Sequence, residues 1–394
     1  MIRELIIAFF LGSSILYANF LLLSVVSDLF SQMTAGNALK ANLLPKLTKF
    51  YDKFEDGSLK QVFSFSRKTS GYLFVMSQII QTAIIFHLNL ESNFLFFAAS
   101  LVLSLSLCFN FSTTIFLTII QARGKFLKYS YASITNSLVF TVLVYPLIGL
   151  ASILGLALSR LAGILSMSYA FVKPMKNKNN GVEIELNRSD FNFPTLILGN
   201  FANIIIISSR CVAGADGSNS ITFFMYAVVI LNTLLTAVIG NVSTILLRKV
   251  SLIKNTRLMV YSLILSLLTG VLMILGIYFF SYEIIEVVYF RGAFSLTDVA
   301  DTSAYLYELS FSFFLLFLAT ILFQPFLSLP ILTTNSIRLK IVYVFFGVLF
   351  LSCAIIVSTD LPPKEKALVV MYCSSLSAFC LAVYSYVKYL KHEK

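Results

Sequence analysis

The stretch YFRGAFSLTD, residues 289–298, is a short polar break between two long apolar runs. Glycine adopts positive φ at little cost, so Arg291-Gly292 predicts a tight turn. Ser295, followed three residues later by Asp298, is typical of a helix N-cap with an acid in the first turn. The stretch therefore predicts that one long apolar helix ends near Tyr289 and that a second begins near Ser295.

The composition places the whole chain in a membrane. Of the 394 residues, 58% are hydrophobic and only 12% are charged. A membrane-spanning helix needs roughly 20 apolar residues, and the chain supplies such runs almost from end to end. Strands of a membrane barrel would alternate polar and apolar residues, and these runs do not. The five cysteines lack metal-ligand spacing, and we expect buried free thiols.

Apolar runs recur along the chain and are separated by short polar breaks. The first run, about 5–27, is interrupted by Gly12-Ser13-Ser14. Ten more candidate spans follow at about 69–90, 94–120, 129–150, 151–172, 191–212, 220–247, 258–281, 302–329, 339–358 and 366–388. The polar segment 173–190 is the best candidate for a linker between two halves.

The basic residues predict the orientation. Of the 29 lysines and arginines, 23 fall in alternate loops and the C-terminal tail, and four fall in the loops of the opposite side. Arg338 and Lys340 are among the 23. Cytoplasmic loops carry the excess of basic residues, so the C-terminus is predicted to be cytoplasmic. The same alternation explains the net charge of +11 without a nucleic-acid partner.

Four motifs resemble the MurJ/MviN-type lipid II flippases of the MOP superfamily, which also contains the MATE exporters. They are RELIIAFFLG (3–12), QARGKF (121–126), the segment from Ser209 to Ala227, and FRGAFSLTD (290–298). The resemblance implies that the chain starts halfway along the first helix of that family and that Ala18–Pro45 is the second. Together with the ten later spans, this gives about twelve transmembrane helices.

The resemblance also implies an architecture. An N-terminal six-helix bundle (1–172) and a C-terminal six-helix bundle (191–394) are expected around a central cavity, joined by a cytoplasmic linker (173–190). The chain is expected to be a multi-pass protein of the bacterial inner membrane. Neither a catalytic group, nor a metal site, nor a cofactor is expected.

Three arginines are candidate contacts for an anionic headgroup. Arg160 lies near the middle of an apolar run, where a charge is costly and often functional; the alternative is a structural arginine paired within the helices. Arg210 and Arg3 fall on arginines of the resembled family. Their alternatives are an interfacial arginine that reaches toward water and an ordinary positively charged flank.

Three further polar residues lie on apolar helices. Gln32 stands where the family carries an arginine and is a candidate substrate contact. Asp28 and Glu308 are the candidates for coupling to an ion or proton, with simple solvation near a helix end as the alternative.

The departures from the family shape the functional expectation. Ala18, Ser31, Gln32 and Val229 stand where lipid II flippases carry charged side chains. We therefore expect an alternating-access flippase for another undecaprenyl-diphosphate-linked glycan, such as an O-antigen, capsule or exopolysaccharide unit. A lipid II flippase is the main alternative. A membrane enzyme would need a sizeable outer loop, and a MATE-like exporter would need buried acids.

Overall fold

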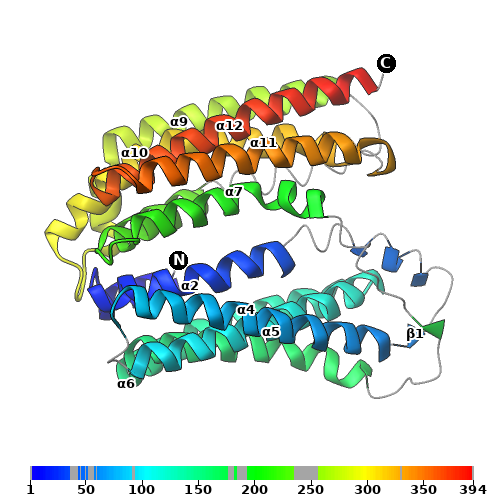
Figure 1. The fold of residues 1–394 in the computed structure, drawn as a ribbon, viewed down its shortest axis with the longest axis horizontal. Coiled ribbons are helices and arrows are strands. Elements are labelled where there is room, and N and C mark those ends of the chain that lie inside the picture. The colour runs from blue at the N-terminus through cyan, green and yellow to red at the C-terminus, as the bar shows by residue number, and fades with distance from the viewer. Residues whose placement is uncertain are drawn as a thin grey trace. The chain divides into compact units, whose positions relative to one another are not determined.

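A computed structural model describes residues 2–35, 43–44, 46–48, 50–51, 57–58, 60–90, 94–175, 182–183, 193–234, 256–328 and 331–392. Within these ranges the chain is almost entirely helical (Figure 1). Nine of the described helices are long and apolar enough to cross a membrane. The expectation of an all-α, multi-pass membrane protein is confirmed, and helix occupies most of the described part of every predicted span.

The chain divides into two compact units. The N-terminal unit is Asn19–Asn200, and the C-terminal unit combines Arg3–Ala18 with Phe201–Lys394. The predicted linker, 173–190, lies largely outside the described residues. Of its described parts, 173–175 end a helix and Val182–Glu183 form strand β2, which pairs in parallel with β1 (Gly57–Ser58). The predicted boundaries of the two bundles stay predictions.

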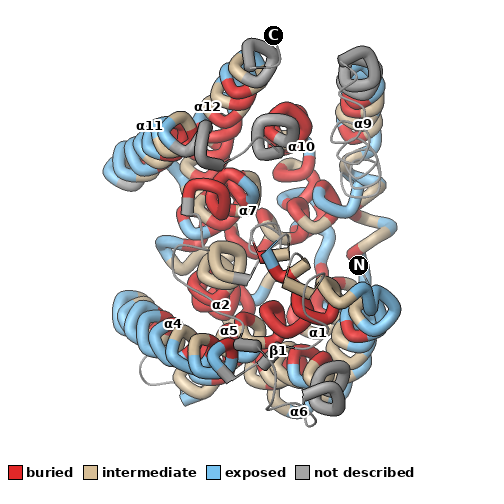
Figure 2. The backbone as a smooth tube through the Cα atoms, turned by 90° about the vertical axis from the view of Figure 1, so that its right-hand side faces the viewer, coloured by how far each residue is buried: buried red, intermediate tan, exposed pale blue. Residues whose placement is uncertain are grey.

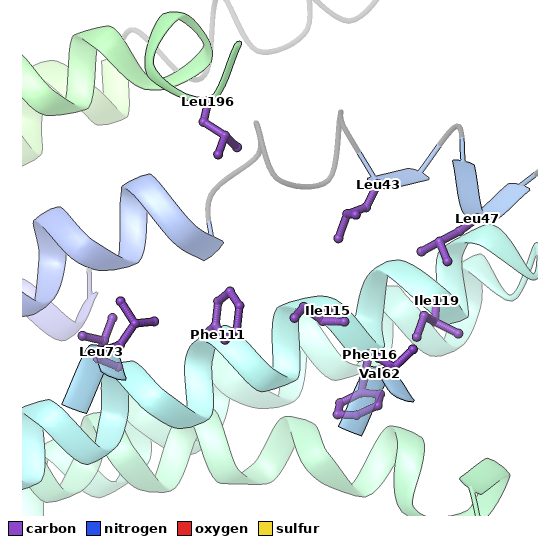
Figure 3. Close-up of a cluster of buried hydrophobic side chains, with 10 residues drawn as sticks. Leu43, Leu47, Val62, Leu73, Phe111, Ile115, Phe116, Ile119 and Leu196 are labelled. Atoms are coloured by element: carbon purple, nitrogen blue, oxygen red, sulfur yellow. The ribbon is translucent and has the colours of Figure 1, made fainter. Parts of the chain in front are cut away.

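The N-terminal unit is built from long helices packed side by side. These are α2 (Ile15–Ala35), whose first turn belongs to the other unit, α4 (Lys60–His87), α5 (Phe94–Ala122) and α6 (Phe126–Met175). Helix α5 packs against both α4 and α6. Leu107, Phe111, Ile115 and Ile119 of α5 recur every four residues and so share one face. Figure 3 shows the cluster of buried side chains that includes this face.

Helix α6 is two helices joined by a turn of minimal length. Ala151 and Ser152 leave the helical conformation, and Ser152 has φ of +49°. The halves then pack closely, because a Cβ on Gly155 would lie 1.8 Å from the carbonyl oxygen of Leu147. A Cβ on Gly163 would lie 2.6 Å from Oδ1 of Asn136. The two spans predicted at 129–150 and 151–172 are therefore both present.

The C-terminal unit has a central helix. Its helices are α1 (Ile2–Leu11), most of α7 (Phe193–Ala213), Ser220–Leu234, α9 (Thr256–Tyr289), α10 (Leu296–Ser328), α11 (Ile331–Val357) and α12 (Pro363–His392). Helix α10 packs against α9 and α12, and α12 packs against α11. Gly270 of α9 makes room for the ring of Phe314, whose Cε2 lies 2.2 Å from the position of the missing Cβ.

Burial separates inner helices from lipid-facing ones. The membrane-spanning part of α10 is 78% buried, whereas that of α9 is 17% buried. Figure 2 shows the same contrast between α10 and the exposed sides of α9 and α11. Apolar side chains on these exposed sides suit a hydrocarbon solvent. The expectation of buried thiols is wrong for Cys211, Cys373 and Cys380, which are free and exposed.

Candidate functional site

The strongest polar feature of the N-terminal unit is an ion pair between two membrane helices. Nη2 of Arg160 on α6 lies 2.6 Å from Oδ1 of Asp28 on α2. The side chains are 26% and 23% exposed, respectively, so the pair is mostly shielded but still accessible. An acid beside a mid-membrane arginine offsets much of the cost of its charge. A guanidinium has five N–H donors in a planar fork, which suits a phosphate group.

Residues of α2 close to Asp28 accept hydrogen bonds from two further helices. Asp28, Ser31 and Gln32 lie on one face of α2, since positions i, i+3 and i+4 stack along a helix. Nδ2 of Asn110 on α5 donates to Oγ of Ser31 at 2.6 Å. Nδ2 of Asn200 on α7 donates to the backbone carbonyl of Gln32 at 2.8 Å. Helices α5, α6 and α7 thus all bond to the last two turns of α2.

The backbone of Gln32 therefore has a structural contact, the hydrogen bond from Asn200. Its carbonyl lies in the last turn of α2, where helical carbonyls lack intrahelical partners. Asn200 supplies a donor there and also bonds to its own helix at the carbonyl of Leu196, 3.2 Å away. The Gln32 side chain is partly exposed beside Asp28. A role for that side chain in substrate binding stays a prediction.

In the C-terminal unit, Arg3 pairs with its sequence neighbour Glu4. Nε of Arg3 donates to Oε1 of Glu4 at 2.8 Å, and Nη2 contacts the same oxygen. The Glu4 side chain is 10% exposed and that of Arg3 is 42% exposed. The acid is thus anchored inside the unit, while the guanidinium stays accessible to a ligand.

Arg210 is buried, in contrast to an interfacial arginine that reaches toward water. Only 4% of the residue is exposed, and its Nη1 lies 3.3 Å from Sδ of Met225. Its neighbour Ser209 contacts Sδ of Met371. Tyr17 lies close enough to interact electrostatically with both Arg3 and Arg210. Arg3, Glu4 and Arg210 of the C-terminal unit thus all act electrostatically on Tyr17.

Glu308 pairs with a lysine near the start of α12. Nζ of Lys364 lies 3.0 Å from Oε1 of Glu308, and it also lies 5.6 Å from the ring centre of Tyr305. The carboxylate and ammonium side chains are 34% and 36% exposed. Such a partly solvated pair contributes about 0–1 kcal/mol. Ion coupling through Glu308 stays a prediction, as it does for Asp28.

The polar break at 289–298 has the local structure that the sequence predicts. The backbone N–H of Ser295 donates to Oδ2 of Asp298 at 2.8 Å, and the N–H of Asp298 lies 3.2 Å from Oγ of Ser295. This reciprocal pair is a capping box at the start of α10. Gly292 has φ of +62°, which forms the predicted turn.

Sequence reasoning missed two buried polar features. Arg338, assigned to a cytoplasmic loop, lies on α11 and is 0% exposed; its position beside a polar segment gave no sign of burial. Serines and glutamines also connect α4 to α5, as in the bond from Ser104 to Ser77 at 3.1 Å. Ser66, Ser70, Ser77 and Gln81 follow a helical spacing that predicts one polar face. Among the described residues, no three His, Cys, Asp or Glu side chains are placed to hold a metal ion.

The fold is similar to those of solved MurJ and MATE structures, and the similarity extends over the whole chain. The structure of a lipid II flippase MurJ in an inward closed conformation superposes with a TM-score of 0.76 at 18% identity, covering 98% of this chain and 84% of that one. An inward-facing multidrug resistance MATE family transporter gives 0.69 at 13% identity, covering 99% and 93%. A MATE structure in the straight conformation gives 0.56 at 12% identity, covering 100% and 88%.

The sequence comparisons find no counterpart. No protein-family model matches the chain, and no curated protein sequence matches it. The resemblance drawn from the four motifs is confirmed at the level of the fold.

Proposed function

We propose that the protein is a flippase that moves a polyprenyl-diphosphate-linked glycan across the bacterial inner membrane by alternating access. The glycan is one other than lipid II, such as an O-antigen, capsule or exopolysaccharide unit. The chain performs no chemical transformation in this proposal. The observation that carries it is the Arg160–Asp28 pair, a cation–anion contact on two membrane helices of a transporter fold.

The pair suits a reversible anion site. Without substrate, Asp28 neutralises Arg160, so that no isolated charge is held within the membrane. A diphosphate brings more negative charge and more acceptor oxygens than one carboxylate, and its bonds to a guanidinium are charge-assisted. It can therefore displace Asp28 from part of the guanidinium fork. When the substrate leaves, Asp28 pairs with Arg160 again, which favours release.

The Arg3–Glu4 pair in the C-terminal unit repeats this arrangement. A buried acid holds an accessible arginine there, and Arg210 supplies a second cation close to the same tyrosine. A substrate that carries two phosphate groups suits these arginines better than an organic cation would, because its oxygens can replace the paired carboxylate as acceptors of the guanidinium N–H groups. This favours an anionic lipid substrate over the drug-like cations expected for a MATE-like exporter.

Binding of a short-chain polyprenyl diphosphate to the purified protein in nanodiscs tests the anion site. We expect Arg160→Ala to weaken binding at least tenfold, which corresponds to about 1.4 kcal/mol or more. Arg67→Ala is the matched control, since Arg67 is an exposed arginine on α4 of the same unit. Equal affinities of Arg160→Ala and the unaltered protein would exclude Arg160 as the diphosphate contact.

Depletion of the resident lipid II flippase in a bacterium separates the two glycan classes. The gene is supplied with its membrane expression confirmed, and growth and lysis are scored. We expect lysis despite expression, because side chains that carry charge in lipid II flippases are absent at Ala18 and Val229. Rescue of growth would instead identify lipid II as a substrate.

A further inference from the structure

The 289–298 segment contacts the end of α1, a role beyond connecting α9 to α10. The N–H of Ala293 donates to the carbonyl of Phe9 at 2.9 Å. Oγ of Ser13 donates to Oδ1 of Asp298 at 2.6 Å. These bonds join parts of the C-terminal unit that are almost 300 residues apart in the sequence.

The contact supplies hydrogen-bond donors to the end of α1. Helix α1 ends at Leu11, and the last carbonyls of a helix lack intrahelical partners. Ala293 bonds to the carbonyl of Phe9, and Oη of Tyr226 donates to the carbonyl of Gly12 at 3.0 Å. The buried end of α1 is therefore satisfied by residues far along the chain.

Two glycines allow the backbones to approach. A Cβ on Gly12 would lie 2.4 Å from the carbonyl oxygen of Ala293, and a Cβ on Gly292 would lie 2.4 Å from that of Phe9. Both glycines also have positive φ, +50° and +62°. The sequence pattern that marks the turn at Gly292 is thus required by the contact with α1 as well.

Asp298 connects this contact to α10. Its Oδ1 accepts from Ser13, while its Oδ2 accepts from the N–H of Ser295 in the capping box. The residue is 7% exposed. One buried carboxylate therefore fixes the start of α10, the central helix of the unit, and the end of α1 together.

Aromatic side chains surround the contact. The ring centre of Tyr226 lies 4.7 Å from that of Tyr289, 5.3 Å from that of Phe294 and 6.0 Å from that of Tyr17. Tyr17 is the residue near both Arg3 and Arg210. Tyr226, which bonds to the end of α1, thus packs against Tyr17, the residue on which both arginines act electrostatically.

We propose that Ser13, Tyr226 and Asp298 are positioning residues that hold α1, and with it the Arg3–Glu4 pair, so that Arg3 and Arg210 act on the same anionic headgroup. The proposal rests on the proposed function, because it assigns these arginines to the diphosphate. The part of the proposal that concerns the position of α1 is tested without any substrate.

Spin labels measure the position of α1 directly. Cysteines are placed at the exposed positions Ile2 on α1 and Tyr307 on α10 in a cysteine-free background of the full chain. We expect a narrow distance distribution that broadens in Ser13→Ala and Tyr226→Phe, and Ser13→Thr is expected to restore it because the hydroxyl is retained. Ser303→Ala on α10 is the control, since within the described part of the chain its hydroxyl bonds to its own helix, at Ala300. Unchanged distributions in both test variants would overturn the proposal.

Binding of a polyprenyl diphosphate then links α1 to the substrate. Arg3→Gln, Ser13→Ala and Tyr226→Phe are each expected to weaken binding about tenfold, as for the loss of one bond to a charged group. The double variant Arg3→Gln with Ser13→Ala is expected to bind no worse than Arg3→Gln alone. If Arg3→Gln weakens binding and the other two do not, the positioning role is wrong while the proposed function stands. If none of the three changes binding although Arg160→Ala does, Arg3 is not a substrate contact and the proposal is likewise overturned.

Discussion

Asp28 and Arg160 are 132 residues apart in the sequence, yet their side chains meet at 2.6 Å between α2 and α6. The acid was predicted as a coupling residue and the arginine as a substrate contact. The structure joins them into one charge-compensated pair. In the proposed cycle, Asp28 competes with the substrate for the guanidinium of Arg160.

Removal of the competing carboxylate is expected to strengthen binding and to slow transport. We expect Asp28→Asn to bind a polyprenyl diphosphate more tightly, because the guanidinium loses the carboxylate of Asp28 as its partner, and to transport it more slowly, because release is hindered. Affinity is measured on the purified protein and the transport rate in proteoliposomes. Weaker binding together with slower transport would indicate instead that Asp28 supports the site structurally.

Exchange of the two charges separates stability from transport. Removing one partner of a buried ion pair costs about 3–5 kcal/mol, and the exposure of roughly a quarter of each side chain reduces that cost here. Arg160→Ala is therefore expected to lower the thermal stability. The double variant Asp28→Arg with Arg160→Asp is expected to recover much of it but not transport, since the cation has moved to α2. Thermal unfolding and transport are measured on the same preparations, and full transport by the double variant would contradict a position-specific role of Arg160.

Much of the fold follows from local patterns. The capping box at Ser295 and Asp298, the turn at Gly292 and the break at Gly12 depend on neighbouring residues, and each is present as predicted. The apolar spans also follow from local hydropathy, because the bilayer sets their length. The four motifs predict a superfamily whose fold the structure shares.

The contacts of the candidate site could not be predicted in the same way. Two contacts depend on which helix faces lie together: Asp28 with Arg160, and Asn200 with the carbonyl of Gln32. A single sequence does not show which faces pack against each other. The sequence predicts a loop position for Arg338, which is in fact buried on a helix, and it leaves open whether Arg210 is buried or interfacial. A basic residue at the end of an apolar run gives the same local signal whether it extends to water or packs inside.

The turn inside α6 depends on a glycine. Gly155→Ala would place a Cβ 1.8 Å from the carbonyl of Leu147, a distance that only a movement of the backbone can relieve. We expect loss of most of the folded protein, measured by fluorescence-detected size exclusion. Gly71→Ala on α4 is the matched control, because nothing lies within 4 Å of its added Cβ. Alanine is favoured over glycine in a helix by about 0.5–1 kcal/mol, so this control is expected to be neutral or slightly stabilising.

Asn200 holds the last turn of α2 through the carbonyl of Gln32. Asn200→Ala removes this bond and leaves a shielded carbonyl without that donor. We expect a loss of about 1 kcal/mol in the free energy of unfolding, together with a weaker diphosphate affinity because Gln32, a predicted substrate contact, lies at the bonded carbonyl. Asn232→Ala, at an exposed position, is the control for both measurements. Normal affinity in Asn200→Ala would limit the role of Asn200 to stability.

Translocation of a fluorescent polyprenyl-diphosphate-linked glycan in proteoliposomes, compared between the unaltered protein, Arg160→Ala and Arg67→Ala at equal reconstitution, tests the central claim most directly. We expect the unaltered protein and Arg67→Ala to move the lipid at the same rate and Arg160→Ala to be reduced to the rate of empty vesicles. Transport by Arg160→Ala at the unaltered rate would contradict the role of the Arg160–Asp28 pair as the site of the diphosphate.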